Sequence, residues 1–236
     1  MSEKNPTVQD IVRAYNLLVR HIDEDASVVD GRAYGGMIRS GKGLLVEGIA
    51  KSIIEIARRN IGGTSKQLSF EKKLISVPIR RLYIDRIDDA EIRDYIRSNV
   101  SKYVYKFRTD VHVSIDQKFV MGVECKAYTE NAMFKRVMVD FTFLKQTHPE
   151  AHAILLQLES QLGGDYGDVG KEKQYGSFPT RTILSYFDVD LTIVTLLEGE
   201  RKVDRPIHKE KFFKPLEISS VKKAVKIFED VLKRRI

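Results

Sequence analysis

Two carboxylates and a lysine lie close together in the segment 108–126, which reads RTDVHVSIDQKFVMGVECK. Side chains two positions apart in a β-strand share one face. If the segment folds back on itself at residues 116–118, Asp110 falls opposite Glu124, and Lys126 follows on the same face. Two oxygen donors suit Mg²⁺, and a nearby lysine can orient a metal-bound water and offset charge on a phosphate. This set of residues therefore favours hydrolysis of a phosphodiester.

The alternation of apolar and polar residues predicts that this segment is a β-hairpin. Its odd positions from Phe107 to Cys125 are apolar, apart from Thr109 and the turn, whereas most even positions are polar. Such alternation is typical of an antiparallel pair with one buried face. The turn would pair Ile115 with Phe119, and a β-bulge would shift the register by one residue. A surface hairpin with an ordinary cluster of cross-strand charges would show the same residues, so that alternative stays open.

The letters TD at positions 109–110 and ECK at positions 124–126 resemble the PD-(D/E)xK motif of a nuclease superfamily that includes many type II restriction endonucleases. The resemblance implies that Asp110 and Glu124 are metal ligands and that Lys126 is the catalytic lysine. It also implies that the metal is Mg²⁺ and that the substrate is double-stranded DNA.

The resemblance covers the hairpin and its flanking elements, at about residues 40–160. Thr109 stands where the family has proline, which is the least constrained position of the motif, so the departure affects recognition more than chemistry. The family often has a further glutamate on a helix before the hairpin. Glu47 is the natural candidate, and it would either complete the acidic cluster or support Lys126.

The elements around the hairpin follow an order that fits the αβββαβ core of that superfamily. Helical spacing of apolar residues, capping residues and continuous apolar runs predict these elements. In chain order they are a helix at Thr7–Asp23, a glycine-rich loop at Gly31–Gly43, a helix at Leu44–Arg59, a strand at Ser76–Ile84, a short helix from Asp88 or Asp89 to about Asn99, the hairpin, a helix at Met133–Lys145 and a strand at Ala151–Leu158. The predicted fold class is α/β, with a mixed central sheet flanked by helices, an N-terminal helix and a basic C-terminal extension.

The chain changes character after residue 160. Residues 163–179 are rich in Gly, Asp, Lys and Tyr and show no periodicity, which predicts a long functional loop or a plain surface loop. A strand at Leu191–Leu197 and a final amphipathic helix starting after Ser219 or Ser220 follow. We expect a single nuclease domain over residues 1–236, with its catalytic core at about 40–160 and DNA contacts in 161–236.

Composition supports a globular protein without a membrane span. Hydrophobic residues make up 42% and charged residues 31% of the 236 residues. No run of apolar residues is long enough to cross a bilayer, and the first residues lack an apolar signal region. The single Cys125 cannot form an internal disulfide, which fits a reducing compartment. We therefore expect a cytoplasmic protein.

Positive charge points to a polyanionic partner. The net charge is +7, and residues 201–236 alone hold 12 Lys and Arg against 5 Asp and Glu. A clustered excess of this kind favours salt-dependent binding to phosphates, although a solvated lysine-rich helix would look the same. The residues expected to contact DNA are Arg32, Arg39, Lys42, Arg108, Lys171, Lys173, Arg181, Arg201, Lys202 and Arg205.

Three other patterns do not support a site. Residues 36–43 nearly match the phosphate-binding loop of nucleotide-binding proteins, but Gly43 stands where a hydroxyl is needed, so no nucleotide cofactor is expected. His148 and His152 are four residues apart, but Pro149 prevents a shared helix, so no zinc site is expected. His112 falls on the catalytic face and is expected to be a neighbour of the metal, because Mg²⁺ prefers oxygen ligands.

The function that the resemblance implies is that of a Mg²⁺-dependent type II restriction endonuclease, which cuts double-stranded DNA at a short specific site. Cutting both strands symmetrically needs two active sites, so we expect a homodimer. One alternative is a repair or junction-resolving nuclease of the same fold, which would cut by DNA shape. Another is a non-catalytic, basic nucleic-acid-binding protein.

Overall fold

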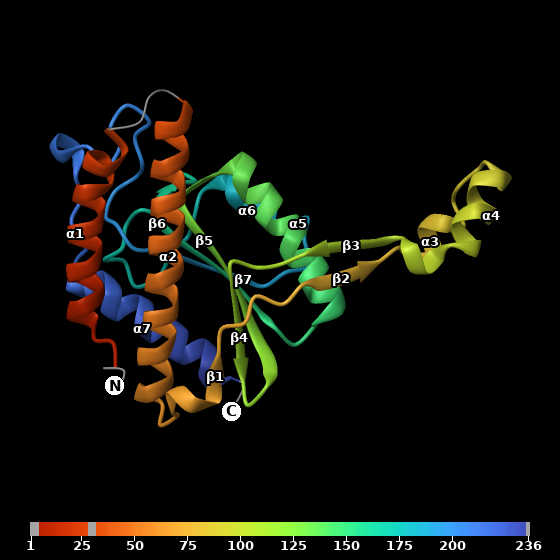
Figure 1. Cartoon of the computed structure of the whole chain (residues 1–236), viewed down its shortest axis with the longest axis horizontal. Helices are drawn as coiled ribbons and strands as arrows, with labels where there is room; N and C mark the ends of the chain where they lie inside the picture. The colour runs from red at the N-terminus through yellow and green to blue at the C-terminus, as the bar shows by residue number, and fades with distance from the viewer. Residues whose placement is uncertain (1–4, 28–31, 235–236) are drawn as a thin grey trace.

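A five-stranded sheet forms the centre of the molecule (Figure 1). This computed structural model describes the backbone of residues 5–27 and 32–234, and the side chains of those residues apart from 20–39. In spatial order the strands of the sheet are β1 (Leu68–Ser69), β4 (Val111–Ile115), β5 (Lys118–Glu130), β6 (His152–Gln161) and β7 (Leu191–Thr195). The first three pair antiparallel, and β5, β6 and β7 pair parallel, so the sheet is mixed.

Helices cover both faces of this sheet. The helices around the sheet are α1 (Val8–Ser27), α2 (Arg32–Asn60), α5 (Asn131–Thr147), α6 (Phe178–Leu184) and α7 (Ile218–Lys233). The order α2, β1, β4, β5, α5, β6 along the chain is the predicted αβββαβ arrangement, and the α/β fold class is confirmed. Short 3₁₀ helices lie at Ser65–Gln67, Val100–Lys102 and Glu210–Phe212.

The alternating side chains of β6 enter two separate hydrophobic cores. Ile154 and Leu156 pack with α1, α2 and α7 on one face, whereas Ala153 and Leu155 pack with α5 on the other. Burial on both faces explains why β6 lies in a continuous apolar run of the sequence. Strand β7 is part of the central sheet, and helix α7 packs in the same core as α1 and α2. The packed core therefore extends well past residue 160.

The second helix begins earlier than the sequence predicts. Helix α2 starts at Arg32, whereas the glycine content of residues 31–43 predicts a loop, with Gly31 outside the described residues. Each glycine costs a helix interior about 1 kcal/mol relative to alanine. Packing of the buried residues Val46, Ile49 and Ile53 against the sheet and α7 offsets that cost. These contacts join residues far apart in the sequence, so the residues around 31–43 do not reveal them. Residues 36–43 are therefore helical and do not form a phosphate-binding loop.

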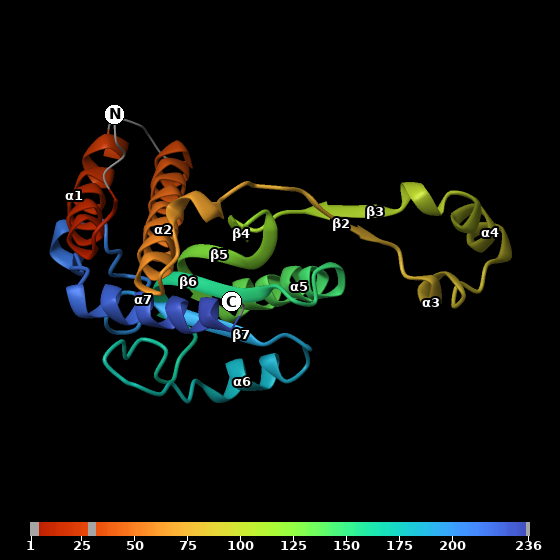
Figure 2. The same cartoon turned by 90° about the horizontal axis from the view of Figure 1, so that it is seen from below.

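The prediction of a core strand at Ser76–Ile84 is wrong. This segment holds β2 (Ile75–Pro78) and α3 (Arg81–Ile84), and β2 pairs antiparallel with β3 (Val104–Phe107), outside the central sheet. Between them lies α4 (Ala90–Ser98), whose N-cap Asp89 accepts a hydrogen bond from the Ile92 amide at 3.0 Å, as the sequence predicts. Residues 75–107, which we call the arm, extend away from the rest of the molecule in both views (Figures 1 and 2). The third strand of the αβββαβ core is instead the two-residue β1.

The hairpin keeps the predicted register near the proposed site but differs at its turn. Asp116 and Gln117 form a two-residue turn with positive φ angles of 47° and 67°, and Ile115 pairs with Lys118 rather than with Phe119. A register shift after Val113 then restores the predicted pairing, so Val111 lies opposite Val123. The bulge that the sequence left open is thus present, and it compensates for the shorter turn.

The prediction of a half-buried hairpin is also wrong. His112, Ser114 and Glu124 are buried although they lie on the polar face. Helix α5 covers this face, and its residues Phe141 and Leu144 lie against Gly122. Among the described residues, no helix is both long and apolar enough to cross a membrane.

Candidate active site

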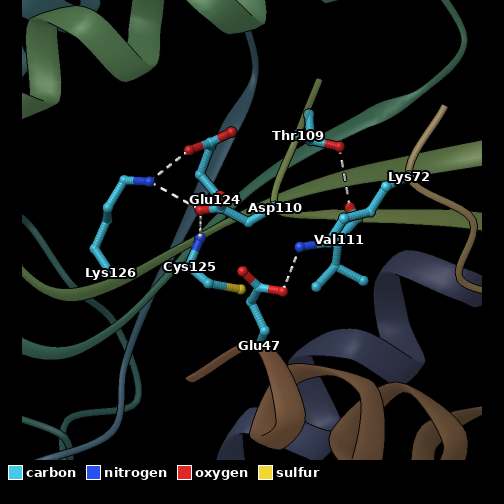
Figure 3. A network of polar contacts seen from close by, with 8 residues as sticks. All are labelled: Glu47, Lys72, Thr109, Asp110, Val111, Glu124, Cys125 and Lys126. Carbon is cyan, nitrogen blue, oxygen red and sulfur yellow. Dashed lines mark hydrogen bonds and ion pairs between the residues drawn. The ribbon is translucent and has the colours of Figure 1, made fainter. Parts of the chain in front are cut away.

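Asp110, Glu124 and Lys126 meet in one cluster on the α5 side of the sheet. The Lys126 ammonium donates hydrogen bonds to Asp110 Oδ2 at 2.9 Å and to Glu124 Oε2 at 2.7 Å (Figure 3). Glu124 and Lys126 lie two positions apart on β5, and Asp110 lies in the bend just before β4. The two-residue period of β5 therefore places Glu124 and Lys126 on one face, and the pairing of β4 with β5 brings Asp110 beside them.

The backbone of the neighbouring strand fixes Asp110. The Cys125 amide donates a hydrogen bond to Asp110 Oδ2 at 2.8 Å, so the carboxylate is held although it precedes β4. The preceding residue, Thr109, is fully buried, and its hydroxyl donates to the Val111 carbonyl at 3.1 Å. A Cβ at Gly122 would lie 2.8 Å from Thr109 Cγ2, so glycine is needed for this close packing. Thr109, which stands where the resembled motif has proline, is thus a packed and hydrogen-bonded residue.

The electrostatics of the cluster favour a cation. Burial raises the pKa of Glu124 to about 7; the Lys126 ammonium opposes this shift, and the Asp110 carboxylate adds to it. Burial alone would lower the pKa of Lys126, but the carboxylates of Glu124 and Asp110 raise it above its usual range. Two carboxylates against one ammonium leave a partly buried net negative charge, which a divalent ion would compensate.

The donor set fits Mg²⁺ better than a metal held entirely by protein. The part of the chain that the structure describes contains no group of three or more His, Cys, Asp or Glu side chains that could hold an ion. Mg²⁺ typically binds one or two carboxylates and completes its octahedron with water and substrate phosphate. Asp110 and Glu124 already share one cationic group, Lys126 Nζ, which shows that a single positive charge can reach both carboxylates.

Glu47 lies beside the cluster but is bonded elsewhere. Its carboxylate accepts a hydrogen bond from Lys72 Nζ at 2.6 Å, and its side chain is 18% exposed. Figure 3 shows Glu47 on α2, on the side of Cys125, and its charge contributes to raising the pKa of the Cys125 thiol. The structure thus brings Glu47 near the site without a direct bond to Lys126.

Several residues expected to contact DNA are occupied by internal contacts. Lys42 is buried, and its ammonium lies 3.0 Å from His208 Nδ1. Arg181 donates to the carbonyls of Tyr175 and Gln174 at 2.7 and 3.0 Å. Arg201 packs with its guanidinium 3.5 Å from the centre of the Tyr128 ring. The side chains of Arg32 and Arg39 lie outside the described residues.

The remaining expected DNA contacts are exposed to solvent. Arg108 directly precedes the site, between β3 and Asp110. Lys171 forms surface ion pairs with Asp168 at 3.2 Å and Asp165 at 3.7 Å. The other exposed residues of this group are Lys173, Lys202 and Arg205.

The structure adds two side chains that the sequence analysis did not single out. Gln157 on β6 is the direct register partner of Lys126, is fully buried, and donates to Thr195 Oγ1 at 3.0 Å. Asp140 on α5 is half-buried, which raises its pKa, and it interacts electrostatically with Lys126 and Asp110. A glutamine inside the apolar run 151–158 is a signal that could have identified Gln157, because buried polar groups need partners. Asp140 has no comparable signal, since it lies at an ordinary polar position of a helix.

Comparison with known proteins identifies one relative that covers nearly the whole chain. No family model matches the chain. The chain is 47% identical over 230 residues to a protein of Desulfomicrobium norvegicum, the type II restriction enzyme DdeI, and the alignment covers 95% of each protein. Among solved structures, the native A2B2 tetramer of BbvCI at low resolution aligns over 97% of this chain and 89% of that chain, with a TM-score of 0.38 and 9% identity. The sequence identity, not this distant structural likeness, carries the comparison.

Proposed function

This chain belongs to the type II restriction enzymes, and from that premise we propose that Asp110, Glu124 and Lys126 are the residues with which it hydrolyses DNA. Membership makes the protein a site-specific deoxyribonuclease. The observation that supports the assignment of the site is the shared contact of Lys126 Nζ with both carboxylates, at 2.9 and 2.7 Å. The residue types of this cluster agree with the PD-(D/E)xK motif that the sequence resembles, which supports the proposal.

In this proposal Asp110 and Glu124 hold Mg²⁺. The bound ion would polarise a phosphoryl oxygen and make its bound water more acidic. The Cys125 amide keeps Asp110 oriented, and burial under α5 limits the access of bulk water to Glu124. The Lys126 ammonium would then face the scissile phosphate, where it would offset the charge that develops during attack. The Glu47 carboxylate, which accepts a hydrogen bond from Lys72, adds negative charge on the α2 side of the cluster.

We further propose that the enzyme acts as a homodimer. Breaking both strands of a symmetric site needs two copies of the Asp110 cluster related by a two-fold axis. Residues 1–236 would then form one nuclease domain per subunit. Candidates for phosphate contacts are the cations whose side chains are exposed to solvent, namely Arg108, Lys173, Lys202 and Arg205.

Plasmid digestion tests the proposed site directly. We expect the wild-type protein to produce discrete fragments with Mg²⁺ and none with EDTA. Lys126→Ala and Glu124→Gln should each lower the cleavage rate by about 10²-fold or more, as expected for loss of a group that stabilises the transition state. Lys66→Ala, at an exposed position far along the chain from the cluster, serves as the control and should cleave normally.

The outcome of this digestion separates the alternatives. Structure-selective cutting of branched DNA without discrete fragments would indicate a repair or junction-resolving activity instead. If folded Lys126→Ala protein still cuts at the wild-type rate, the assignment of the site to this cluster is wrong.

A further inference from the structure

The arm divides into two segments of opposite charge. The first, residues 75–86 and 99–107, comprises β2, β3 and α3, and we call it the base; it holds five Lys and Arg against one Asp. The second is the tip, residues 87–98, which holds four Asp and Glu against two Arg. The tip contains α4, which lies farthest from the sheet in both views (Figures 1 and 2). Because one segment is cationic and the other is acidic, the arm can pair with a second copy of itself.

A cavity at the base of the arm is large, apolar and rimmed by cations. It measures about 960 Å³ and lies between the arm and α5. Its cationic lining residues are Arg80, Arg86 and Lys102, and no carboxylate contributes to its lining among the described residues. Aromatic rings of the arm and of α5 form its walls, among them Tyr83, Tyr105 and Phe143. An occupant should therefore be apolar at its centre and acidic at its edge.

The tip of the arm presents that combination. On α4, residues three or four apart share a face, which brings Glu91, Ile92 and Tyr95 onto one stripe, and Asp88 lies just before the N-cap Asp89. Ile92 is 52% and Tyr95 63% exposed, so both apolar side chains lack cover within the chain. Asp88 and Glu91 are exposed and flank them. A helix stripe of this kind has the length and chemistry to enter the cavity at the base of another arm.

We propose that the arm joins two copies of this chain, with the tip of each arm docked in the basal cavity of the other. The exchange is reciprocal, as a two-fold interface requires, because one contact between tip and cavity implies the second. It pairs Glu91 and Asp88 with the cationic rim around Arg86, and it covers Ile92 and Tyr95. The inference rests on the homodimer proposed above and names the surface that forms it.

The charge of the tip favours a second copy of the chain over DNA as the occupant of the cavity. DNA would meet the cations of the base, but the four carboxylates of the tip would repel its phosphates. Six large apolar side chains of the arm are at least 44% exposed, and exposed apolar groups in this density mark contacts between proteins. They are Leu82, Tyr83, Ile92, Tyr95, Val100 and Tyr105.

Complementary charge reversal tests the exchange. The first variant reverses the base with Arg80→Glu and Arg86→Glu, and the second reverses the tip with Asp88→Lys and Glu91→Lys. Among the described residues, none of these four side chains forms an ion pair, so the changes should leave the fold intact. The control carries Lys66→Glu and Lys222→Glu, two exposed positions outside the arm. The oligomeric mass of each protein is measured without DNA by light scattering after gel filtration.

The wild type and the control should elute at twice the chain mass of 27.1 kDa. Each reversed variant alone should dimerise about tenfold more weakly or worse, because like charges then face each other in both contacts. Mixing the two variants should restore the dimer, since both contacts of the mixed pair join opposite charges. One chain that carries all four substitutions should also dimerise, but not with the wild type.

Each other result overturns the exchange. Unchanged dimers of the reversed variants would place the interface elsewhere and leave the proposed function intact. A monomeric wild type would remove the proposed homodimer as well, while plasmid cleavage would still report on the active site. Weaker DNA binding by the base variant, stronger binding by the tip variant and no recovery on mixing would assign the arm to DNA.

Discussion

Lys126 and Gln157 are direct partners on the parallel strands β5 and β6, so their side chains lie on the same face of the sheet. Gln157 is fully buried, its amide donates to Thr195 Oγ1 at 3.0 Å, and its carbonyl oxygen has no partner among the described residues. A buried acceptor without a partner is costly, and Lys126, the register partner of Gln157, carries an ammonium donor. The row Lys126, Gln157, Thr195 thus continues the polar cluster into the sheet.

We expect Gln157→Leu to lower kcat by about tenfold and to leave stability almost unchanged. If a metal ion engages Asp110 and Glu124 as proposed, Lys126 would need another acceptor to stay aligned, and leucine offers none. The loss of one unsatisfied acceptor offsets the lost hydrogen bond to Thr195. Cleavage kinetics and the thermal midpoint measure the two effects, with Thr195→Val as the control that removes only the bond to Gln157. A normal kcat in Gln157→Leu would show that this residue does not position Lys126.

Ca²⁺, which has oxygen preferences similar to those of Mg²⁺, should raise the thermal midpoint of the wild type. At 100 times the dissociation constant, a ligand stabilises the native state by about 2.7 kcal/mol. Asp110→Asn and Glu124→Gln should each remove most of this gain, because each deletes one of the two carboxylates. Differential scanning fluorimetry with and without Ca²⁺ provides the measurement, and Glu47→Gln shows whether the third carboxylate contributes. A full gain in Glu124→Gln would place the ion elsewhere.

Gly122→Ala should destabilise the protein by about 1–3 kcal/mol, as overpacking of a dense core does. The new Cβ would lie 2.8 Å from Thr109 Cγ2 and 2.9 Å from Leu144 Cδ2. Because Thr109 precedes Asp110, cleavage should fall as well. Gly48→Ala on α2 is the matched control, since nothing lies within 4 Å of its Cβ, and it should stabilise by up to about 1 kcal/mol. Adding Thr109→Ser to Gly122→Ala removes the clashing methyl and should recover part of the stability; no recovery would assign the loss to Leu144.

His112 should make the protein less stable in mild acid. Burial, followed by the positive charges of His148 and Lys73, lowers the pKa of His112 from 6.5 to about 4. The unfolded chain therefore takes up its proton first, so this contribution is complete above about pH 6.5 and is lost as the pH falls toward 4. We expect the loss to reach about 2–3 kcal/mol.

Urea unfolding between pH 7.5 and 4.5 compares the wild type with His112→Phe. Glu124, with its raised pKa, acts in the opposite direction, so its contribution is lost as the pH rises through about 7. The difference between the two proteins isolates His112, since both retain Glu124. Identical pH profiles would mean that His112 is hydrated in solution.

The alternating pattern of the hairpin was enough to predict which residues meet at the site. A period of two fixes the face of each side chain, and the register shift after Val113 compensated for the shorter turn. The fold class followed from the order of helices and strands. These features arise from interactions between residues no more than about twenty positions apart, so the local sequence pattern is enough to predict them.

The arm and the full length of α2 depend on distant contacts. The segment at 75–84 alternates like any strand, but its partner is β3, about thirty residues later, and nothing local distinguishes that partner from the central sheet. Helix α2 tolerates its glycines because α1 and α7 pack against its C-terminal half, and α7 lies at the other end of the chain. Glu47 could be identified as a nearby carboxylate, but not as the partner of Lys72, because that ion pair joins a helix to a loop.

Only Arg108 and Thr109 separate the last residue of β3 from Asp110. If the arm joins two subunits as proposed, a pull on it would be transmitted within two residues to Asp110, a proposed metal ligand. In that proposal, a subunit without its companion would lose part of the alignment of this carboxylate. We expect such a lone subunit to be slow to nick one strand, which would protect the host chromosome from unpaired breaks.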